Sequence, residues 1–322
     1  MPPILRRTVL GTAIALTLAT PALADTFPSK PITLVVTQGP GSGSDVTGRL
    51  IANYLGPLLG QSVVVENRAG ASGIIGHQSV MRAAPDGYTL LFTSTAGLFV
   101  VPVINPNAKY GLGDFATVAP VMRAPFAVLV ANTPTAPKTM AELLAALKSK
   151  PQSYASAGVG TMTHLGSELV LRKAGVQATH IPYKGSGAAL TDLMGGQVLF
   201  ATDSLTAAMT HIRSGKLRAL AVTDLAREGS LPEVPTLTEA GLPGVQVAAV
   251  GGIFAPKGTP KEIVDKIAAA TAKVLENPEV QKRLAAVETD PIKASADEFA
   301  GLLRKEQAVW EPLVRQLGIK AE

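Results

Sequence analysis

Short apolar runs alternate with amphipathic segments along the chain. Runs such as 32–37 are short and rich in β-branched residues, whereas segments such as 45–59 show the spacing of a helix with one apolar face. This alternation predicts an α/β fold in which most strands are parallel. In the first series we expect strands over 32–37, 63–66, 88–93, 118–122 and 126–131, and helices over 45–59 and 74–82.

A second series follows Pro134 and Pro137, and a helical tail closes the chain. Ser295 with Glu298 has the spacing of a capping box, as have Thr139 with Glu142 and Thr259 with Glu262. The expected helices are 139–148, 163–173, 188–194 and 205–213, and the expected strands are 154–157, 179–182, 198–202, 217–223 and the apolar run 245–254.

Two series joined near 125–140 and again near 240–255 predict two lobes with two crossings. Two crossings form a hinge, and the cleft between two α/β lobes is where such folds bind ligands. We therefore expect a periplasmic-binding-protein-like fold, each lobe containing a mostly parallel, doubly wound sheet. The expected division is 25–125 for the first lobe, 126–249 for the second, and 250–322 for the return to the first; the last helix is a candidate to pack on the second lobe.

Residues 1–24 have the features of a cleaved export signal rather than of the fold. Arg6 and Arg7 precede an apolar stretch that is too short to span a bilayer, and Ala22-Leu23-Ala24 is a small-x-small cleavage site. Leu5 and Val9 stand where a twin-arginine signal usually has a small polar residue and a Phe, so the Sec route is favoured over the Tat route. We therefore expect a periplasmic protein.

Composition narrows the ligand class. Removing 24 of the 322 residues leaves 298, with a formal charge of 27 minus 24, or +3. There is no cysteine, and no basic stripe with interleaved aromatics, so a thiol nucleophile and nucleic-acid binding are not expected. Aromatic residues make up only 4% of the chain, which favours a small polar or charged ligand over a sugar stacked on aromatic rings.

Both series open with a glycine-rich turn between a strand and a helix. The first is Gly39-Pro40-Gly41-Ser42-Gly43-Ser44, and the second is Gly158-Val159-Gly160-Thr161. The first amides of a helix have no internal partner and the helix dipole favours an anion there, so one turn on each wall of a cleft would hold a carboxylate. The alternative is that both are ordinary turns of a doubly wound fold. Neither completes a dinucleotide fingerprint, and no Walker A sequence is present.

Several side chains near these turns are candidates for ligand contacts. Asp45 would contact the ligand or cap its own helix, and His164 would hydrogen-bond the ligand or pack. Lys184 and Tyr183 offer a cation and a hydroxyl after another strand. Asp203, also between a strand and a helix, would receive a ligand ammonium or act as a cap.

Catalysis is not expected. The four histidines are dispersed without metal-ligand spacing, and no serine has the glycine spacing of a hydrolase nucleophile elbow. We therefore expect no cofactor and no metal. An α/β enzyme acting on a carboxylated substrate is the alternative, and a solute sensor that serves a signalling protein is another.

The order of the motifs resembles the substrate-binding receptors of tripartite tricarboxylate transporters, also called the Bug family, over essentially the whole mature chain. The resemblance is carried by the segments 31–36, 41–45 with Arg49, 65–73 (Val-Glu-Asn-Arg-Ala-Gly-Ala-Ser-Gly), 85–90 (Pro-Asp-Gly-Tyr-Thr-Leu), 158–161 with His164-Leu165, 182–185, 214–222, 234–241 and 255–260.

This resemblance implies a two-lobed receptor that closes on a carboxylated ligand such as a di- or tricarboxylate, an acidic amino acid, or an aromatic or heterocyclic acid. Backbone amides and bridging waters at 41–45 and 158–164 would grip the ligand, with Ser94 and Thr95 facing the cleft. The protein would be a monomer that delivers its ligand to two integral-membrane transporter subunits. Thr37-Gln38 and Val250-Gly251 replace bulkier residues usual in the family, which allows a larger or more polar ligand than a small amino acid.

Overall fold

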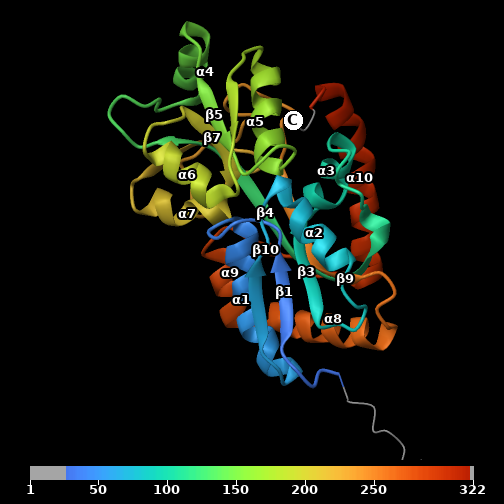
Figure 1. The fold of residues 1–322 in the computed structure, drawn as a ribbon. Helices are drawn as coiled ribbons and strands as arrows, with labels where there is room; N and C mark the ends of the chain where they lie inside the picture. The colour runs from blue at the N-terminus through green and yellow to red at the C-terminus, as the bar shows by residue number, and fades with distance from the viewer. Residues whose placement is uncertain (1–26, 320–322) are drawn as a thin grey trace, which may run out of the picture.

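The computed structural model describes residues 27–319, which form two α/β lobes stacked end to end (Figure 1). The expected export signal and cleavage site lie outside the described residues. One ten-stranded sheet runs through both lobes in the order β2-β1-β3-β9-β4-β7-β5-β6, and β8 and β10 also pair with β4. The two-lobed α/β fold expected from the sequence is thus the fold of the chain.

Lobe one contains the parallel strands β2, β1 and β3, next to β9, which is antiparallel to β3. Ile32, Leu34 and Val35 are fully buried, because helices cover this sheet on both sides. The strands are β1 (Ile32–Val36), β2 (Val63–Asn67), β3 (Thr89–Ser94) and β9 (Ala248–Pro256), and the helices between them are α1 (Gly43–Leu59), α2 (Ile74–Met81), the π-helical turn η2 (Ala96–Val100) and α3 (Val101–Ile104).

Lobe two repeats this plan. Its strands β6, β5 and β7 are parallel, and β4 and β8 complete the sheet in antiparallel pairs. Separate apolar cores fill the two faces of this sheet. The strands are β5 (Ser153–Ser156), β6 (Thr179–Pro182), β7 (Phe200–Ser204) and β8 (Leu217–Val222), and the helices are α4 (Met140–Ser149), α5 (Met162–Ala174), α6 (Ser186–Met194) and α7 (Leu205–Arg213).

Strand β4 (Phe115–Ala131) joins the lobes, and here two expected strands are one. Its first part pairs with β9 as far as Pro125, and from Phe126 onward it pairs with β7 and β8. The register of the β4–β9 ladder shifts twice, around 117–119 and 120–122. Such bulges tolerate a residue that has no amide hydrogen, so the strand continues through Pro120.

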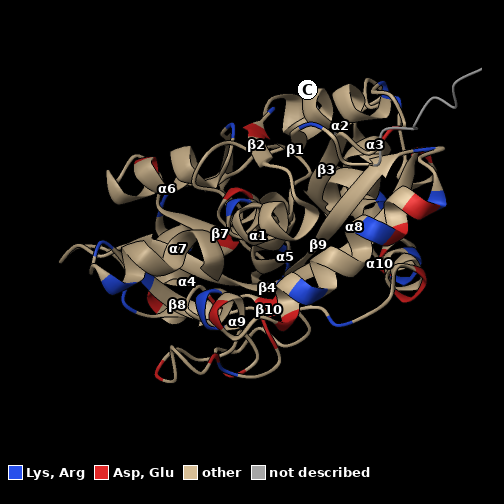
Figure 2. Cartoon of the chain, turned by 90° about the horizontal axis from the view of Figure 1, so that it is seen from below, with Lys and Arg blue, Asp and Glu red and all other residues tan. Residues whose placement is uncertain are grey.

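The C-terminal helices return to lobe one. In α10, Phe299, Leu303 and Trp310 join the lobe-one core, and the end of this helix meets lobe two where Arg172 Nη1 donates to the Gln316 carbonyl at 3.2 Å. Figure 2 shows cations and anions interspersed on the outer faces of helices such as α8. The remaining elements are α8 (Lys261–Glu276), α9 (Pro278–Ala285), β10 (Asp290–Pro291), α10 (Ala296–Leu317) and the short 3-10 turns η1 (Ala71–Gly73) and η3 (Leu112–Asp114).

The helix caps follow the sequence only in part. The Ser295–Glu298 capping box at α10 is confirmed, with both reciprocal bonds present. Thr139 caps α4, but the carboxylate of Glu142 accepts from the amide of Lys138 instead of Thr139. The box expected at Thr259 is wrong, because the hydroxyl of that residue donates to the Pro256 carbonyl and Pro260 precedes α8 with no side-chain cap.

Candidate functional site

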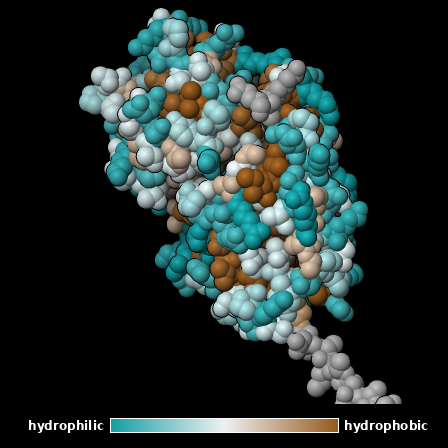
Figure 3. Space-filling view, viewed as in Figure 1, coloured by the Kyte–Doolittle hydropathy of each residue, from teal (hydrophilic) through white to brown (hydrophobic). Residues whose placement is uncertain are grey.

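Each of the two glycine-rich turns contacts the opposite lobe at the boundary between the lobes. A Cβ atom built on Gly43 of α1 would lie 2.7 Å from Ser204 Oγ, and one on Gly39 would lie 2.8 Å from the Lys184 carbonyl oxygen. These contacts join residues of different lobes, so the cleft is closed. Figure 3 shows apolar residues at the surface where the two lobes meet.

A small cavity of about 30 Å³ lies at this boundary, with room for roughly one water molecule. Four helices begin beside it: α1 from lobe one, and α5, α6 and α7 from lobe two. The residues that line it are Gln38, Gly43, Ser44, Ser94, Met122, Ala124, Phe126, Met162, Thr163, Ser186, Asp203, Ser204 and Ala249.

Residues from both lobes that have unpaired backbone amides line this cavity. Within residues 27–319, the amides of Gly43 and Ser44 have no acceptor, and neither have those of Met162 and Thr163. These are the first two amides of α1 and of α5, where the helix dipole leaves partial positive charge. The arrangement can therefore hold an anion between the lobes.

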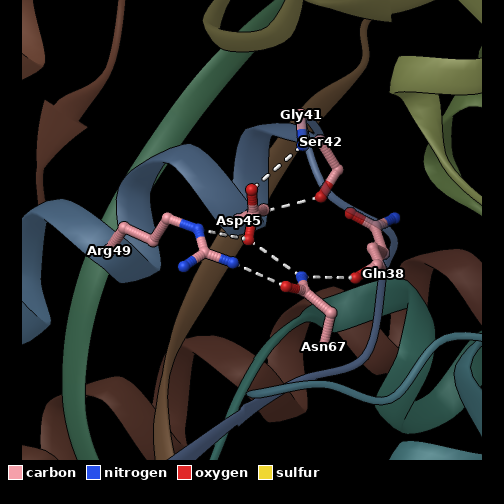
Figure 4. Close-up of polar contacts among 6 residues, drawn as sticks. All are labelled: Gln38, Gly41, Ser42, Asp45, Arg49 and Asn67. Carbon is pink, nitrogen blue, oxygen red and sulfur yellow. Dashed lines mark hydrogen bonds and ion pairs between the residues drawn. The ribbon is translucent and has the colours of Figure 1, made fainter. Parts of the chain in front are cut away.

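Asp45 organises the lobe-one turn from within (Figure 4). Its Oδ2 accepts from the Gly41 amide at 3.0 Å, and its Oδ1 accepts from Arg49 Nε at 2.9 Å and from Asn67 Nδ2 at 2.8 Å. Asn67 Nδ2 also donates to the Gln38 carbonyl at 3.0 Å. Both oxygens of Asp45 are therefore engaged inside lobe one, and we assign this residue to positioning of the turn rather than to ligand contact.

The hydroxyls at the two helix starts are also used internally. Ser42 Oγ accepts from the Asp45 amide at 3.2 Å, which makes Ser42 the N-cap of α1. In lobe two, Thr161 Oγ1 donates to the Gly158 carbonyl at 2.7 Å and accepts from the His164 amide at 3.4 Å. Because these two side chains fix the turns, the groups that remain available at the two helix starts are backbone amides.

Gly160 has a different role from the one expected. Its amide donates to His164 Nδ1 at 3.0 Å and thus points into its own lobe. Its φ is +75°, and a Cβ atom there would lie 2.1 Å from Ile104 Cδ1 of lobe one. Gly160 therefore permits close approach of the lobes.

Neutral histidines support the lobe-two turn. The rings of His164 and His180 are stacked with their centroids 3.9 Å apart, and His180 Nε2 lies 2.6 Å from Ser156 Oγ. Burial, and next the neighbouring His180, lower the pKa of His164 to about 3, and burial lowers that of His180 to about 4. A neutral His164 is required for Nδ1 to accept the Gly160 amide.

Asp203 is a carboxyl group with one free oxygen. Oδ1 accepts from Ser186 Oγ at 2.8 Å and from the Ser204 amide at 2.7 Å, whereas Oδ2 has no hydrogen-bond partner in the described part of the chain. The residue is 1% exposed and lines the small cavity together with Ser44 and Ser94. Burial raises the pKa of Asp203 to about 7, against the opposing hydrogen bonds.

A second cavity, of about 210 Å³, shares the lining residue Gln38 with the first. Tyr183 and Lys184 line it, but Tyr183 OH donates to Asp192 Oδ2 at 2.7 Å and the Lys184 side chain is exposed. Gly158 and Thr161 also line this cavity. Thr95 lines neither cavity, and its buried hydroxyl has no partner among the described residues.

The turn 70–73 is part of this boundary and was not predicted as such. Four successive residues have positive φ: Gly70 at 125°, Ala71 at 46°, Ser72 at 56° and Gly73 at 91°. Positive φ is uncommon for Ala and Ser, and strain of this kind concentrates at binding sites. A Cβ atom on Gly158 would lie 3.1 Å from Ser72 Oγ. The sequence Gly-Ala-Ser-Gly, with two glycines in four residues, was the signal from which this turn could have been predicted.

Metal-ligand groupings and membrane-spanning helices are both absent from the part of the chain that the structure describes. Within residues 27–319, no group of three or more His, Cys, Asp or Glu residues is arranged to hold a metal ion. None of the helices described there combines the length and apolar character needed to cross a membrane.

Two lobes of this topology, closed over a cavity lined by helix N-termini, define the class of periplasmic solute-binding proteins. The structure of the periplasmic binding protein BugD supports this class, with a TM-score of 0.87 and 33% identity, covering 92% of this chain and 100% of that one. A profile of the tripartite tricarboxylate transporter family receptor matches residues 47–319. The chain belongs to this receptor family, as its motifs implied.

Two similar structures contain ligands. MatC from Rhodopseudomonas palustris, with bound malate, is 33% identical with a TM-score of 0.85, covering 89% of this chain and 100% of that one. A second R. palustris protein, with adipate, is 32% identical with a TM-score of 0.87, covering 91% of this chain and 99% of that one.

Proposed function

We propose that this receptor captures a small carboxylate between its lobes for a tripartite transporter. The observation that carries this proposal is that one cavity is lined from both lobes by residues with unpaired amides at the starts of α1 and α5, namely Gly43 and Ser44 and Met162 and Thr163. Each charge-assisted hydrogen bond contributes roughly 1.5–3 kcal/mol, so four are enough for micromolar binding.

Cavity size and family support a small acid. The larger cavity, about 210 Å³, is below the roughly 300–1,000 Å³ typical of sites for drug-sized ligands. The similar structures with malate and adipate hold dicarboxylates.

A thermal-shift comparison tests the ligand class. Malate or adipate should raise the transition temperature, with stabilisation growing as RT ln(1 + [L]/Kd), or about 2.7 kcal/mol at one hundred times Kd. The matched controls are the neutral diamides of the same acids and a panel of sugars. Stabilisation by sugars or diamides in the absence of stabilisation by any di- or tricarboxylate would overturn the proposal.

The cellular setting is part of the same proposal. Export through the Sec route with cleavage after Ala24 would place the receptor in the periplasm as a monomer, where it delivers its ligand to two integral-membrane subunits without turnover. N-terminal sequencing of the periplasmic fraction should find Asp25 first. Loss of ligand uptake on deletion of the membrane subunits, with the receptor retained, would support delivery, and unchanged uptake would contradict it.

A further inference from the structure

Asp203 presents an electrostatic conflict that the carboxylate-binding proposal must resolve. Its Oδ2 is buried and unpartnered, and it lines the cavity where the amides of Ser44 and Thr163 favour an anion. A ligand carboxylate and an ionised Asp203 would then share a site of low dielectric constant. Two carboxylates in such a site hold one proton between them.

We propose that Asp203 is protonated in the ligand-bound state, so that Oδ2 donates a hydrogen bond to the anionic ligand and binding takes up one proton from solvent. The inference rests on the proposed function, because it requires an anion in the cleft. Oδ1 keeps its bonds from Ser186 and Ser204, which leaves the proton on Oδ2.

No ionisable side chain on the surrounding, described elements donates a hydrogen bond to Asp203 Oδ2. Burial is the largest cause of the raised pKa of Asp203, and only Ser186 and Ser204 oppose it. The other ionisable groups on these elements are already paired, exposed or distant. The paired ones are Asp45 with Arg49, His164 with the Gly160 amide, Tyr154 with Glu168, Asp192 with Tyr183, and Arg123 with Asp224. Lys184 is exposed, and His211 and Arg213 lie at the far end of α7.

Asp203→Asn is the discriminating variant. The amide keeps one oxygen for Ser186 and Ser204 and places a permanent donor where the proton would sit, so it imitates the protonated acid. For an unliganded pKa of about 7, the wild-type Kd for malate should rise roughly 20-fold from pH 6.5 to pH 8.5. The variant should bind at both pH values about as tightly as the wild type does at pH 6.5.

Calorimetry in two buffers of different ionisation enthalpy counts the protons directly. Wild type should take up close to one proton per malate at pH 8.5 and about a quarter at pH 6.5, and Asp203→Asn should take up none. Glu228→Gln is the matched control, because burial and nearby acids also raise the pKa of Glu228 to about 7, yet this residue lines neither cavity. His77, His164 and His180 titrate below this range, since burial lowers their pKa values to about 4, 3 and 4.

The possible outcomes distinguish failure of the Asp203 protonation proposal from failure of the carboxylate-binding proposal. Proton uptake that disappears in Asp203→Asn and persists in Glu228→Gln supports the assignment. Uptake that persists in Asp203→Asn, no uptake by wild type, or a loss of affinity in Asp203→Asn at both pH values would overturn it and leave the carboxylate proposal intact. If neither malate, adipate nor any other carboxylate binds the wild type, the proposed function fails, and this inference fails with it.

Discussion

Gly43→Ala would insert a single methyl group between the lobes without disturbing either lobe. Gly43 is the first residue of α1 and does not have a positive φ, so alanine is compatible with its backbone and favours the helix. The new Cβ would lie 2.7 Å from Ser204 Oγ and 3.4 Å from Thr206 Cβ, both across the boundary. Ligand binding should weaken because the cleft no longer closes fully.

The expected loss of affinity in Gly43→Ala follows from one short contact. Only the distance to Ser204 Oγ is below ordinary van der Waals contact, and this oxygen caps α7 by accepting from the Ala207 amide at 3.3 Å. Overpacking of this kind costs roughly 1–3 kcal/mol, which corresponds to a loss of affinity of about 5- to 150-fold. The ligand-free protein can open to avoid the contact, so its thermal transition should stay within about 1 °C of wild type.

Calorimetry with the stabilising carboxylate measures the affinity, and small-angle scattering measures whether ligand still reduces the radius of gyration. Gly229→Ala is the control, because a Cβ atom there meets nothing within 4 Å. Adding Ser204→Ala removes the clashing oxygen, so the double variant should regain affinity relative to Gly43→Ala, with Ser204→Ala alone as the reference. Wild-type affinity in Gly43→Ala would refute the reasoning that the closed boundary is the ligand-bound arrangement.

Two other changes test the interior of the site. Asn67→Ala removes the donor to Gln38 and Asp45 and the acceptor of Arg49, so affinity should fall about tenfold as the lobe-one turn loses its position; stability should fall by roughly 1–3 kcal/mol, measured by urea unfolding. An unchanged affinity would show that this network does not position the turn. Asp203→Asn should stabilise the ligand-free protein more at pH 8 than at pH 5, because folding raises this pKa from 3.8 to about 7 and wild-type stability falls as pH rises through that interval. The gain at pH 8 should approach about 4 kcal/mol, and an equal gain at both pH values would contradict the raised pKa.

Local sequence patterns predicted the structural features that depend on neighbouring residues in the chain. Apolar runs located most strands, and the glycine-rich turns located the starts of α1 and α5, because both signals lie within a few neighbouring residues. Ser42 and Thr161 are N-caps, as their residue types favour. The same signals could not show that the starts of α1 and α5 line one cavity, since they are more than one hundred residues apart in the sequence.

Features that depend on distant partners were missed or misassigned. The continuity of β4 through Pro120 depends on bulges against β9, a strand that comes far later in the chain. The amide of Gly160 is occupied because His164 is neutral and buried, which no turn motif reveals. The unpaired oxygen of Asp203 is apparent only once every neighbouring donor has been assigned.

The pairing of strand β4 with both lobes has a consequence for how the molecule is expected to unfold. Because its 17 residues supply ladder hydrogen bonds to both halves of the sheet, neither lobe has a complete sheet without it. Excision of the middle of the chain would cut this strand and leave open edges on both fragments. We therefore expect the lobes to unfold as a single cooperative unit, so that a ligand bound at their boundary would stabilise the whole chain against denaturation and proteolysis.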